Sequence, residues 1–483
     1  MFNPTVQRVL GLLLAIFSLT MLPPIVFSLV FQDGTWTVFV EAFLIVLFVG
    51  LLLWWPARRS KSDLRLRDGF LIVASFWVVL GLFGSVPFLL SMNPQIGLTD
   101  AVFESISGLT TTGATVLTGL DDLPQSILYY RQQLQWFGGL GIIVLAVAVL
   151  PMLGVGGMQL YRAEAPGPVK DSKLTPKITK TAKALWYIYL GITVLCCLAY
   201  WAAGMSFFDA LCHSFSTVAI GGFSTHDASM GFFDSQLIQS IAVFFMFVAG
   251  VNFALHFVAW RDRNVLTYFA DPEFRTYLWF LGALSGIVLV YLLITGFFPT
   301  TSQTVLNGLF QVVSIATTTG YTTDDFSSWP GALPVLLIFA SFVGGCAGST
   351  AGGMKVVRWA LMYRQGVREF IRLVHPSAEI PVRLGTKAVN PRVVDSVWGF
   401  FAVYVVVFTV LILVMMAAGL DQTTAFSAVA ASLNNLGPGL GDVATGFGTL
   451  PGIAKWSAIV AMLLGRLEIF TLLVLVTPVF WRG

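Results

Sequence analysis

Four short segments centred on glycine contain the residues whose chemistry is most informative. They are Thr111-Thr112-Gly113, Ile220-Gly221-Gly222, Thr318-Thr319-Gly320 and Asn435-Leu436-Gly437. Rings of backbone carbonyl groups can replace the water around a dehydrated cation without any fixed charge. Glycine adopts the dihedral angles that such a backbone requires at the lowest conformational cost. We therefore predict that these segments line a cation filter, with one ring of carbonyl groups at the four glycines.

The same pattern precedes each of these glycines. An apolar stretch occupies residues 101–109, 210–218, 308–316 and 425–433, and a small residue lies twelve positions before each glycine. Stretches of this length are too short to cross a bilayer and are typical of re-entrant segments. A short helix there would point its partly negative C-terminal end at the filter and favour a cation. A single segment of this kind is more often a plain turn, but four in register favour the filter.

The third segment gives the clearest indication of the ion. Thr318-Thr319-Gly320-Tyr321 resembles the Thr-x-Gly-Tyr core of potassium-channel filters, whereas the other three segments lack the tyrosine. Each segment has one ring glycine, which suggests fewer well-defined carbonyl rings than in those channels. We expect potassium to be preferred and other alkali ions to be admitted in part.

The composition places these segments in a membrane protein. Of 483 residues, 57% are apolar and only 11% are charged, where a soluble protein would carry about 25%. Runs of about 20 apolar residues predict ten transmembrane helices. The first is expected to be a retained helix and not a signal peptide, because it is long and no small-residue cleavage site follows. The ten spans are 9–31, 36–55, 69–91, 134–155, 184–204, 235–259, 276–298, 332–353, 396–419 and 453–480.

The distribution of basic residues predicts the orientation. The connections 56–67, 157–183, 261–275 and 355–392 hold 22 of the 27 Lys and Arg residues. Basic residues collect on the cytoplasmic side, so we expect both termini in the cytoplasm. The net charge of +3 is too small for a nucleic-acid surface, whereas the basic connections suit lipid headgroups.

These features predict an all-α integral membrane protein with four pseudo-fourfold helix–pore-loop–helix repeats around one pore. Two extra helices precede the repeats. The expected units are 1–67 for the N-terminal helices, followed by 68–165, 166–270, 271–385 with a gate loop, and 386–483 for the repeats.

A gate is expected below the third filter segment. Residues 344–353 contain five glycines, each of which costs a helix about 1 kcal/mol relative to alanine, so we predict a break in the span. Close helix packing through small residues is the alternative, and both can hold. The predicted gate residues in this segment are Gly344, Gly345, Gly348, Gly352 and Gly353.

Arg466 is the second candidate for the gate. An arginine near the middle of a span is costly and usually faces a protein or aqueous interior. A structural ion pair with Glu468 or Glu41 is the alternative, although Glu468 lies only two residues away and on a different helix face. Elsewhere, Glu104 and Asn252 are expected to hold pore helices or the second repeat in place.

Two histidines, His213 and His226, flank the second filter segment. We expect them to form hydrogen bonds, with pH sensing as the alternative.

At the four segments the sequence resembles the Trk/Ktr/HKT superfamily of potassium transporters, most closely its TrkH type, over nearly the whole chain. The matching strings lie at 107–115, 219–224, 317–322 and 434–439. The resemblance implies a homodimer with one pore per subunit and a cytosolic nucleotide-binding regulatory ring of the TrkA kind. It also implies that loop 344–353 obstructs the pore on its cytoplasmic side and that Arg466 acts as an electrostatic barrier beside it.

The resulting hypothesis is channel-like potassium uptake across a bacterial inner membrane, with potassium as the substrate and no organic cofactor. Symport of potassium with protons or sodium is the alternative, but such transporters commonly use inverted repeats, and these repeats share one orientation. An enzyme is not expected, because the chain lacks the usual hydrolase, zinc and phosphate-loop motifs.

Overall fold

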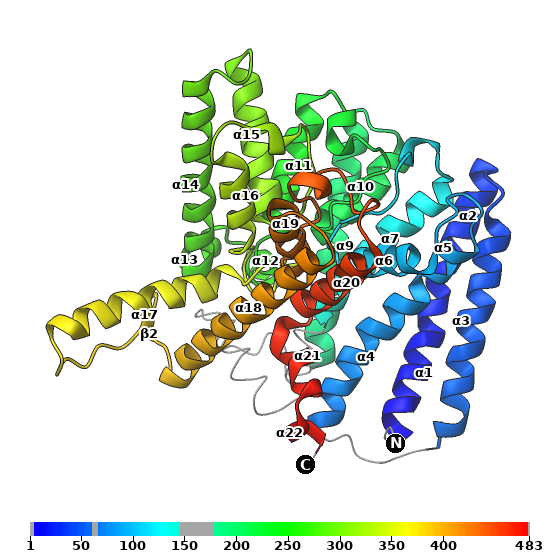
Figure 1. Cartoon of the computed structure of the whole chain (residues 1–483), viewed down its shortest axis with the longest axis horizontal. Coiled ribbons are helices and arrows are strands. Elements are labelled where there is room, and N and C mark those ends of the chain that lie inside the picture. The colour runs from blue at the N-terminus through cyan, green and yellow to red at the C-terminus, as the bar shows by residue number, and fades with distance from the viewer. Residues whose placement is uncertain (1–3, 60–65, 145–177, 482–483) are drawn as a thin grey trace.

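The computed structural model describes residues 4–59, 66–144 and 178–481 (Figure 1). Within these residues all regular secondary structure is helical apart from one two-stranded hairpin, β1 (Arg383–Leu384) with β2 (Lys387–Ala388). The expected all-α class is confirmed. The end of the predicted span 134–155, most of the basic connection 157–183 and the boundary at 165 lie outside the described residues.

Two candidate spans precede the first repeat, as expected. The first consists of α1 (Pro4–Ser18) and α2 (Leu22–Phe31), and the second is α3 (Trp36–Ala57). Helices α1 and α3 pack closely because Gly11 and Gly50 face each other. A Cβ atom on Gly11 would lie 2.8 Å from the carbonyl oxygen of Gly50. Small residues that let two backbones approach are the usual basis of helix packing in membranes. This group stands at one side of the molecule, drawn in dark blue (Figure 1).

Each repeat contains an outer helix, a short pore helix and a second span. The pore helices are α6 (Leu98–Leu109), α10 (Phe207–Ala219), α15 (Thr301–Ala316) and α19 (Gln422–Leu433). The outer helices are α4 (Leu66–Gly84) with α5 (Val86–Leu90), α9 (Ile178–Ala202), α14 (Pro272–Thr295) and α18 (Pro391–Ala417). The second spans are α7 (Gln125–Val144), α11 (Gln236–Ala249) with α12 (Phe253–Asp262), α16 (Leu333–Ser341), and α20 (Gly452–Arg466) with α21 (Glu468–Val476).

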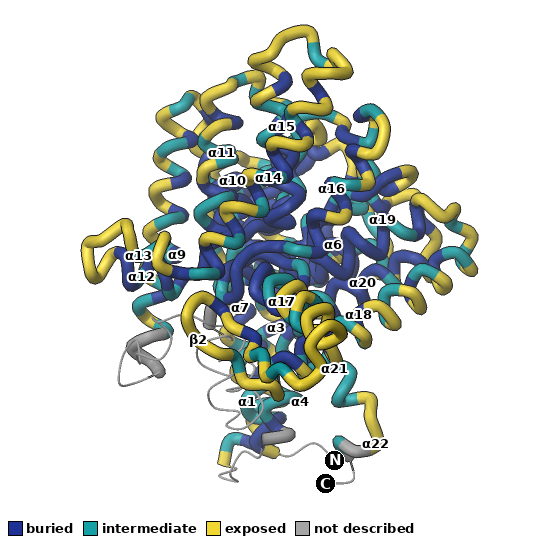
Figure 2. Tube along the Cα trace, turned by 90° about the vertical axis from the view of Figure 1, so that its left-hand side faces the viewer, coloured by how far each residue is buried: buried dark blue, intermediate teal, exposed yellow. Residues whose placement is uncertain are grey.

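Side-chain caps mark the start of three of the four pore helices. Ser206, Thr300 and Asp421 precede α10, α15 and α19, and their side chains accept hydrogen bonds from backbone amides in the first turn. Such capping satisfies amides that have no partner inside the helix. The pore helices are buried at the centre of the molecule, whereas the outer helices expose apolar side chains (Figure 2). This arrangement suits a protein surrounded by lipid.

The expected count of ten spans is not confirmed by the described residues. Six helices are long and apolar enough to cross a membrane, and two bent pairs raise the number to eight among the described residues. The pair α11–α12 bends by 94° and the pair α20–α21 by 115°. The first bend forms because the Asn252 side chain caps α12 by accepting from the amide of Ala254 at 2.8 Å. The second occurs at Glu468, whose φ is +54°.

The second span of repeat 3 is also interrupted. Helix α16 ends at Ser341 and the chain is not helical again until α17 (Val356–Val374). Gly344, Gly348 and Gly353 have positive φ angles of 68° to 75° in between. Helix α17 then runs outward from the body of the molecule (Figure 1). The remaining short helices are α13 (Leu266–Ala270) and α22 (Pro478–Trp481).

Candidate functional site

The four glycine segments meet in a closed ring. A Cβ atom placed on Gly113 would collide with the carbonyl oxygen of Gly221, the residue just before the ring glycine of repeat 2. The same relation joins Gly222 to the carbonyl of Thr319 in repeat 3 and Gly320 to that of Leu436 in repeat 4. The ring closes where a Cβ atom on Gly437 would lie 2.8 Å from the carbonyl oxygen of Thr112. Sequence segments about a hundred residues apart therefore surround one axis.

The backbone of all four segments follows one alternating pattern. Each ring glycine has a positive φ, between 78° and 98°, and so does the residue two positions earlier. Those earlier residues are Thr111 at 52°, Ile220 at 54°, Thr318 at 68° and Asn435 at 54°. Three of them are β-branched, and such residues rarely adopt this conformation. Backbone strain of this kind persists only where the surrounding structure enforces it, and it concentrates at functional sites.

Oxygen atoms and helix ends give the ring a negative character. Pore helices α6, α10, α15 and α19 end three or four residues before their ring glycines, so their partly negative C-termini adjoin the segments. Two buried oxygens, Thr111 Oγ1 and Asn435 Oδ1, have no hydrogen-bond partner among the described residues. Buried oxygens without a donor suit a cation or its water.

The loop 344–353 lies directly against the inner end of these segments. The amide of Gly352 donates to Thr318 Oγ1 at 2.7 Å, and that of Gly353 donates to the carbonyl of Asn434 at 3.0 Å. The Thr350 hydroxyl donates to the carbonyl of Val218 at 2.9 Å, near the end of α10. The loop thus contacts repeats 2, 3 and 4. These contacts are at the end of the glycine segments where the sequence predicted the gate.

The loop 344–353 also contacts both bent spans, α11–α12 and α20–α21. The amide of Cys346 donates to the carbonyl of Gly250 at the α11–α12 bend, at 2.9 Å. From the α20–α21 bend, Arg466 donates to the carbonyls of Thr350 at 3.1 Å and Gly138 at 3.4 Å. Its side chain is buried, and its Nε has no hydrogen-bond partner in the described part of the chain. A buried guanidinium therefore lies between the loop and α7.

Glu468 pairs with a residue that the sequence did not suggest. Its Oε2 atom accepts a 2.8 Å hydrogen bond from Arg358 in α17. The bend at Glu468 places this carboxylate on a separate helix from Arg466. The alternative of an Arg466–Glu468 pair has no support in these contacts.

Arg131 is not among the candidate residues that the sequence pattern indicates. Arg131 lies within α7 and is only 1% exposed. Its Nε atom is 2.7 Å from Oε1 of Glu104, which is fully buried in α6. Gln135, one turn further along α7, donates to the carbonyl of Gly221 at 2.6 Å. Helix α7 therefore packs against the second glycine segment and hydrogen-bonds to it.

The expected hydrogen-bonding role of the histidines agrees with their contacts. His213 Nε2 is 3.0 Å from Ser224 Oγ and Nδ1 is 2.9 Å from the carbonyl of Asp209. The hydroxyl of Tyr321, from the third segment, donates to the carbonyl of His213 at 3.2 Å. The tyrosine thus points away from the ring and ties repeat 3 to α10.

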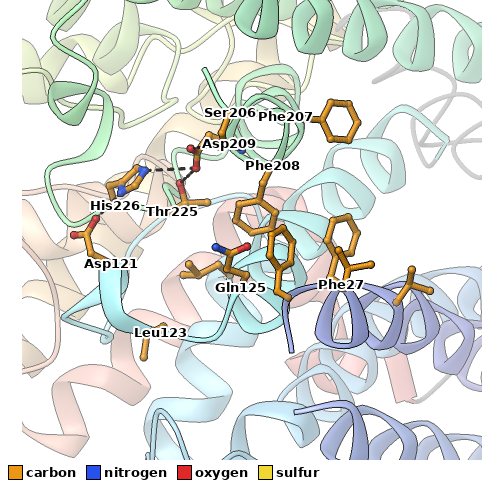
Figure 3. Close-up of a pocket in the computed structure, with 14 residues that line it drawn as sticks. Phe27, Asp121, Leu123, Gln125, Ser206, Phe207, Phe208, Asp209, Thr225 and His226 are labelled. Carbon is orange, nitrogen blue, oxygen red and sulfur yellow. Dashed lines mark hydrogen bonds and ion pairs between the residues drawn. The ribbon is translucent and has the colours of Figure 1, made fainter. Parts of the chain in front are cut away.

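Four residues after Gly222, His226 lies between two carboxylates at one end of a cavity of about 590 Å³ (Figure 3). Its Nδ1 is 2.5 Å from Asp121 Oδ1 and its Nε2 is 3.5 Å from Asp209 Oδ1. Burial alone would lower the pKa of His226, but its contacts with Asp209 and Asp121 outweigh burial and raise the pKa above the ordinary value. Although burial raises the pKa of each carboxyl, hydrogen bonds, chiefly from His226, lower it overall.

Comparisons with known proteins agree with this architecture. A family model described as TrkH, a cation transport protein, matches residues 36–481. The Trk system potassium uptake proteins TrkH of Halomonas elongata and Escherichia coli K12 are 60% and 54% identical, each covering 99% of both chains. The crystal structure of the potassium transporter TrkH from Vibrio parahaemolyticus superposes with a TM-score of 0.93 at 55% identity and covers both chains completely.

Proposed function

Because this chain belongs to the TrkH family of cation transport proteins, we propose that it takes up potassium through a channel-like path between its four repeats. The observation that carries the proposal is the closed ring of Gly113, Gly222, Gly320 and Gly437 with its fourfold alternating backbone. Carbonyl groups held in such a ring can replace the hydration shell of potassium. Its relatives are named potassium uptake proteins of the Trk system.

The path begins at the outer mouth. Asp121, Asp227 and several other acidic residues lie in the outer connections, where they raise the local cation concentration. The ion then loses water at the filter, whose residues are the twelve of the four glycine segments. The C-termini of the pore helices offset part of the dehydration cost.

Below the filter, the loop 344–353 and Arg466 form the gate. The loop contacts repeats 2, 3 and 4 at their glycine segments or pore-helix ends, and the buried guanidinium opposes a cation in the same space. Opening requires the loop to leave Thr318 and Asn434. In this proposal a cytosolic regulatory ring of the TrkA kind, acting on a homodimer, supplies the energy for that movement. The amphipathic helix α17 follows the loop directly. A movement of α17 on the cytoplasmic side would therefore be transmitted to the loop.

The proposed location is the bacterial inner membrane, with both termini in the cytoplasm. The support is the excess of basic residues in the connections 56–67, 261–275 and 355–392. Cysteine-accessibility labelling at Gly366 and Gly296 in intact cells tests this orientation. Labelling of Gly366→Cys from outside would contradict it.

Flux into liposomes tests the function itself. The purified chain is expected to pass potassium down its gradient, faster than sodium, without any second ion gradient. Uphill potassium movement driven by a proton or sodium gradient would instead support the alternative, symport. Equal rates for potassium and sodium would contradict the assigned filter.

A further inference from the structure

A buried ion pair lies behind the filter, and the proposed path does not use it. Glu104 in α6 and Arg131 in α7 are 0% and 1% exposed, with 2.7 Å between Oε1 and Nε. Replacing such a pair by apolar side chains of similar size is often neutral for stability or even stabilising. Fold stability alone therefore does not account for the pair, and its further contacts point to another role.

Arg131 reaches the filter segments of two repeats. Its Nη2 donates to the hydroxyl of Thr115 at 3.1 Å, and its Nη1 donates to the carbonyl of Ser224 at 3.1 Å. Thr115 and Ser224 occupy the same position in their repeats, two residues after Gly113 and Gly222. The guanidinium also lies over the ring of Phe223, 4.2 Å from its centroid. One planar side chain thus fixes the spacing between two of the four segments.

Glu104 completes this attachment from the pore helix. Its carboxylate accepts from the Thr115 hydroxyl at 3.0 Å and from the amide of Val116 at 3.0 Å. Charge-assisted hydrogen bonds are stronger than neutral ones. The first filter segment is therefore held from above its ring glycine by an anion and a cation together.

The position that Glu104 occupies in repeat 1 holds a different residue type in each of the other repeats. It lies nine residues before the ring glycine, where the other repeats have His213, Gln311 and Ala428. His213 contacts its own segment at Ser224 Oγ, and Gln311 Nε2 donates to the carbonyl of Asp324 at 3.1 Å. Alanine in repeat 4 has no polar group to do this. Support behind the ring is thus strongest between repeats 1 and 2.

We propose that Arg131 is a positioning residue for the filter: with Glu104 it holds Thr115 and Ser224, and thereby sets the preference for potassium over sodium. This inference rests on the proposed function, because it assumes that the four segments are the filter. Arg131 touches no ion and acts only through these two segments. A lysine cannot replace it, because its single ammonium group lacks the planar fork that serves three acceptors at once.

The test compares Arg131→Lys with Lys455→Gln in liposomes. Lys455 also pairs with α6, through Asp100 at 2.7 Å, but its other hydrogen bond goes to Gly448 and not to a filter segment. Arg131→Lys is expected to lower the ratio of potassium to sodium flux by about tenfold, the effect of one lost charge-assisted hydrogen bond. Lys455→Gln is expected to lower the unfolding temperature in detergent and leave the flux ratio unchanged.

Two further outcomes keep the test decisive. A folded Arg131→Lys variant with the wild-type flux ratio overturns the inference. If that variant does not fold, Glu104→Gln, which removes the charge but keeps the shape, must lower the ratio, and an unchanged ratio overturns the inference equally. A wild-type chain that does not distinguish potassium from sodium overturns the proposed function itself, which separates the two failures.

Discussion

The backbone amide of Gly352 donates a 2.7 Å hydrogen bond to the hydroxyl of Thr318. Thr318 lies two residues before a ring glycine, so the interrupted span of repeat 3 contacts the glycine segment of its own repeat directly. The adjacent bond from Gly353 to the carbonyl of Asn434 extends the contact to repeat 4. Moving the loop breaks both bonds, so in the proposed function the gate and the inner end of the filter change together.

Gly352 provides a sharp test of the loop. A Cβ atom on Gly352 would collide with the carbonyl oxygen of Asn434, and backbone atoms cannot easily give way. Gly352→Ala, or removal of one or two residues from 344–353, is therefore expected to displace the loop and raise basal potassium flux several-fold. Gly366→Ala in α17 is the control, because nothing lies within 4 Å of its Cβ position. Wild-type flux in a folded Gly352→Ala variant would count against the gate.

Two substitutions of Arg466 distinguish the effect of its charge from the effect of its hydrogen bonds. Arg466→Ala removes both the buried charge and the bonds to Thr350 and Gly138, so basal flux is expected to rise. Arg466→Lys keeps the charge and should leave flux closer to that of the wild type. Single-channel or liposome flux measurements at equal protein amounts distinguish the two. If the alanine variant conducts no more than the wild type, Arg466 is not a barrier.

The ring glycines test the filter. Alanine at Gly113 or Gly320 would place a Cβ atom against a carbonyl of the next repeat, where φ is already +80° or +81°. Each substitution is expected to reduce the preference for potassium over sodium while the protein still inserts. Gly296→Ala is a matched control, since its φ is +61° but nothing lies within 4 Å. Selectivity that survives at Gly113 and Gly320 would refute the assignment.

His226 predicts a pH dependence of stability. Since its pKa is raised in the folded protein, the protonated ring stabilises the fold fully below its unfolded value of about 6.5. This contribution is lost as pH rises through the raised folded value. The pKa values of Asp121 and Asp209 are lowered, so their contribution is lost only in acid, below about pH 4.

The corresponding measurement is the unfolding temperature in detergent between pH 5.5 and 8.5. The wild-type value is expected to fall with rising pH across the alkaline part of this range, and His226→Gln should flatten the curve. His375→Gln, at the exposed end of α17, should behave as the wild type. Parallel curves for the wild type and His226→Gln would show that the protonation of His226 does not stabilise the fold.

The sequence predicted the membrane class and the four segments because both depend on patterns that repeat. Apolar length and glycine register are local signals, so the segments at 113, 222, 320 and 437 could be aligned without a structure. The assignment of these residues to a filter, the boundaries of the repeats and the gate remain predictions. The geometry adds that the segments meet around one axis.

The bends and the buried pair could not be predicted in the same way. Hydropathy averages over a window, so a single cap at Asn252 or a left-handed residue at Glu468 leaves the apolar signal intact while it breaks the helix. Arg131 was missed because a charge next to a span suggests water, and its partner Glu104 lies 27 residues away in sequence. The polar run Gln132, Gln133 and Gln135 was the available signal that this part of the chain is buried against polar atoms.

Contacts around the ring are not equal. At Gly437 a Cβ atom would lie 2.8 Å from Thr112, whereas at the other three glycines the neighbouring carbonyl is closer still. In a channel made of four identical chains every substitution occurs four times. Here one chain supplies all four repeats, so a substitution changes one repeat alone. The wider contact between Gly437 and Thr112 is therefore the place where the ring can best accept a larger side chain.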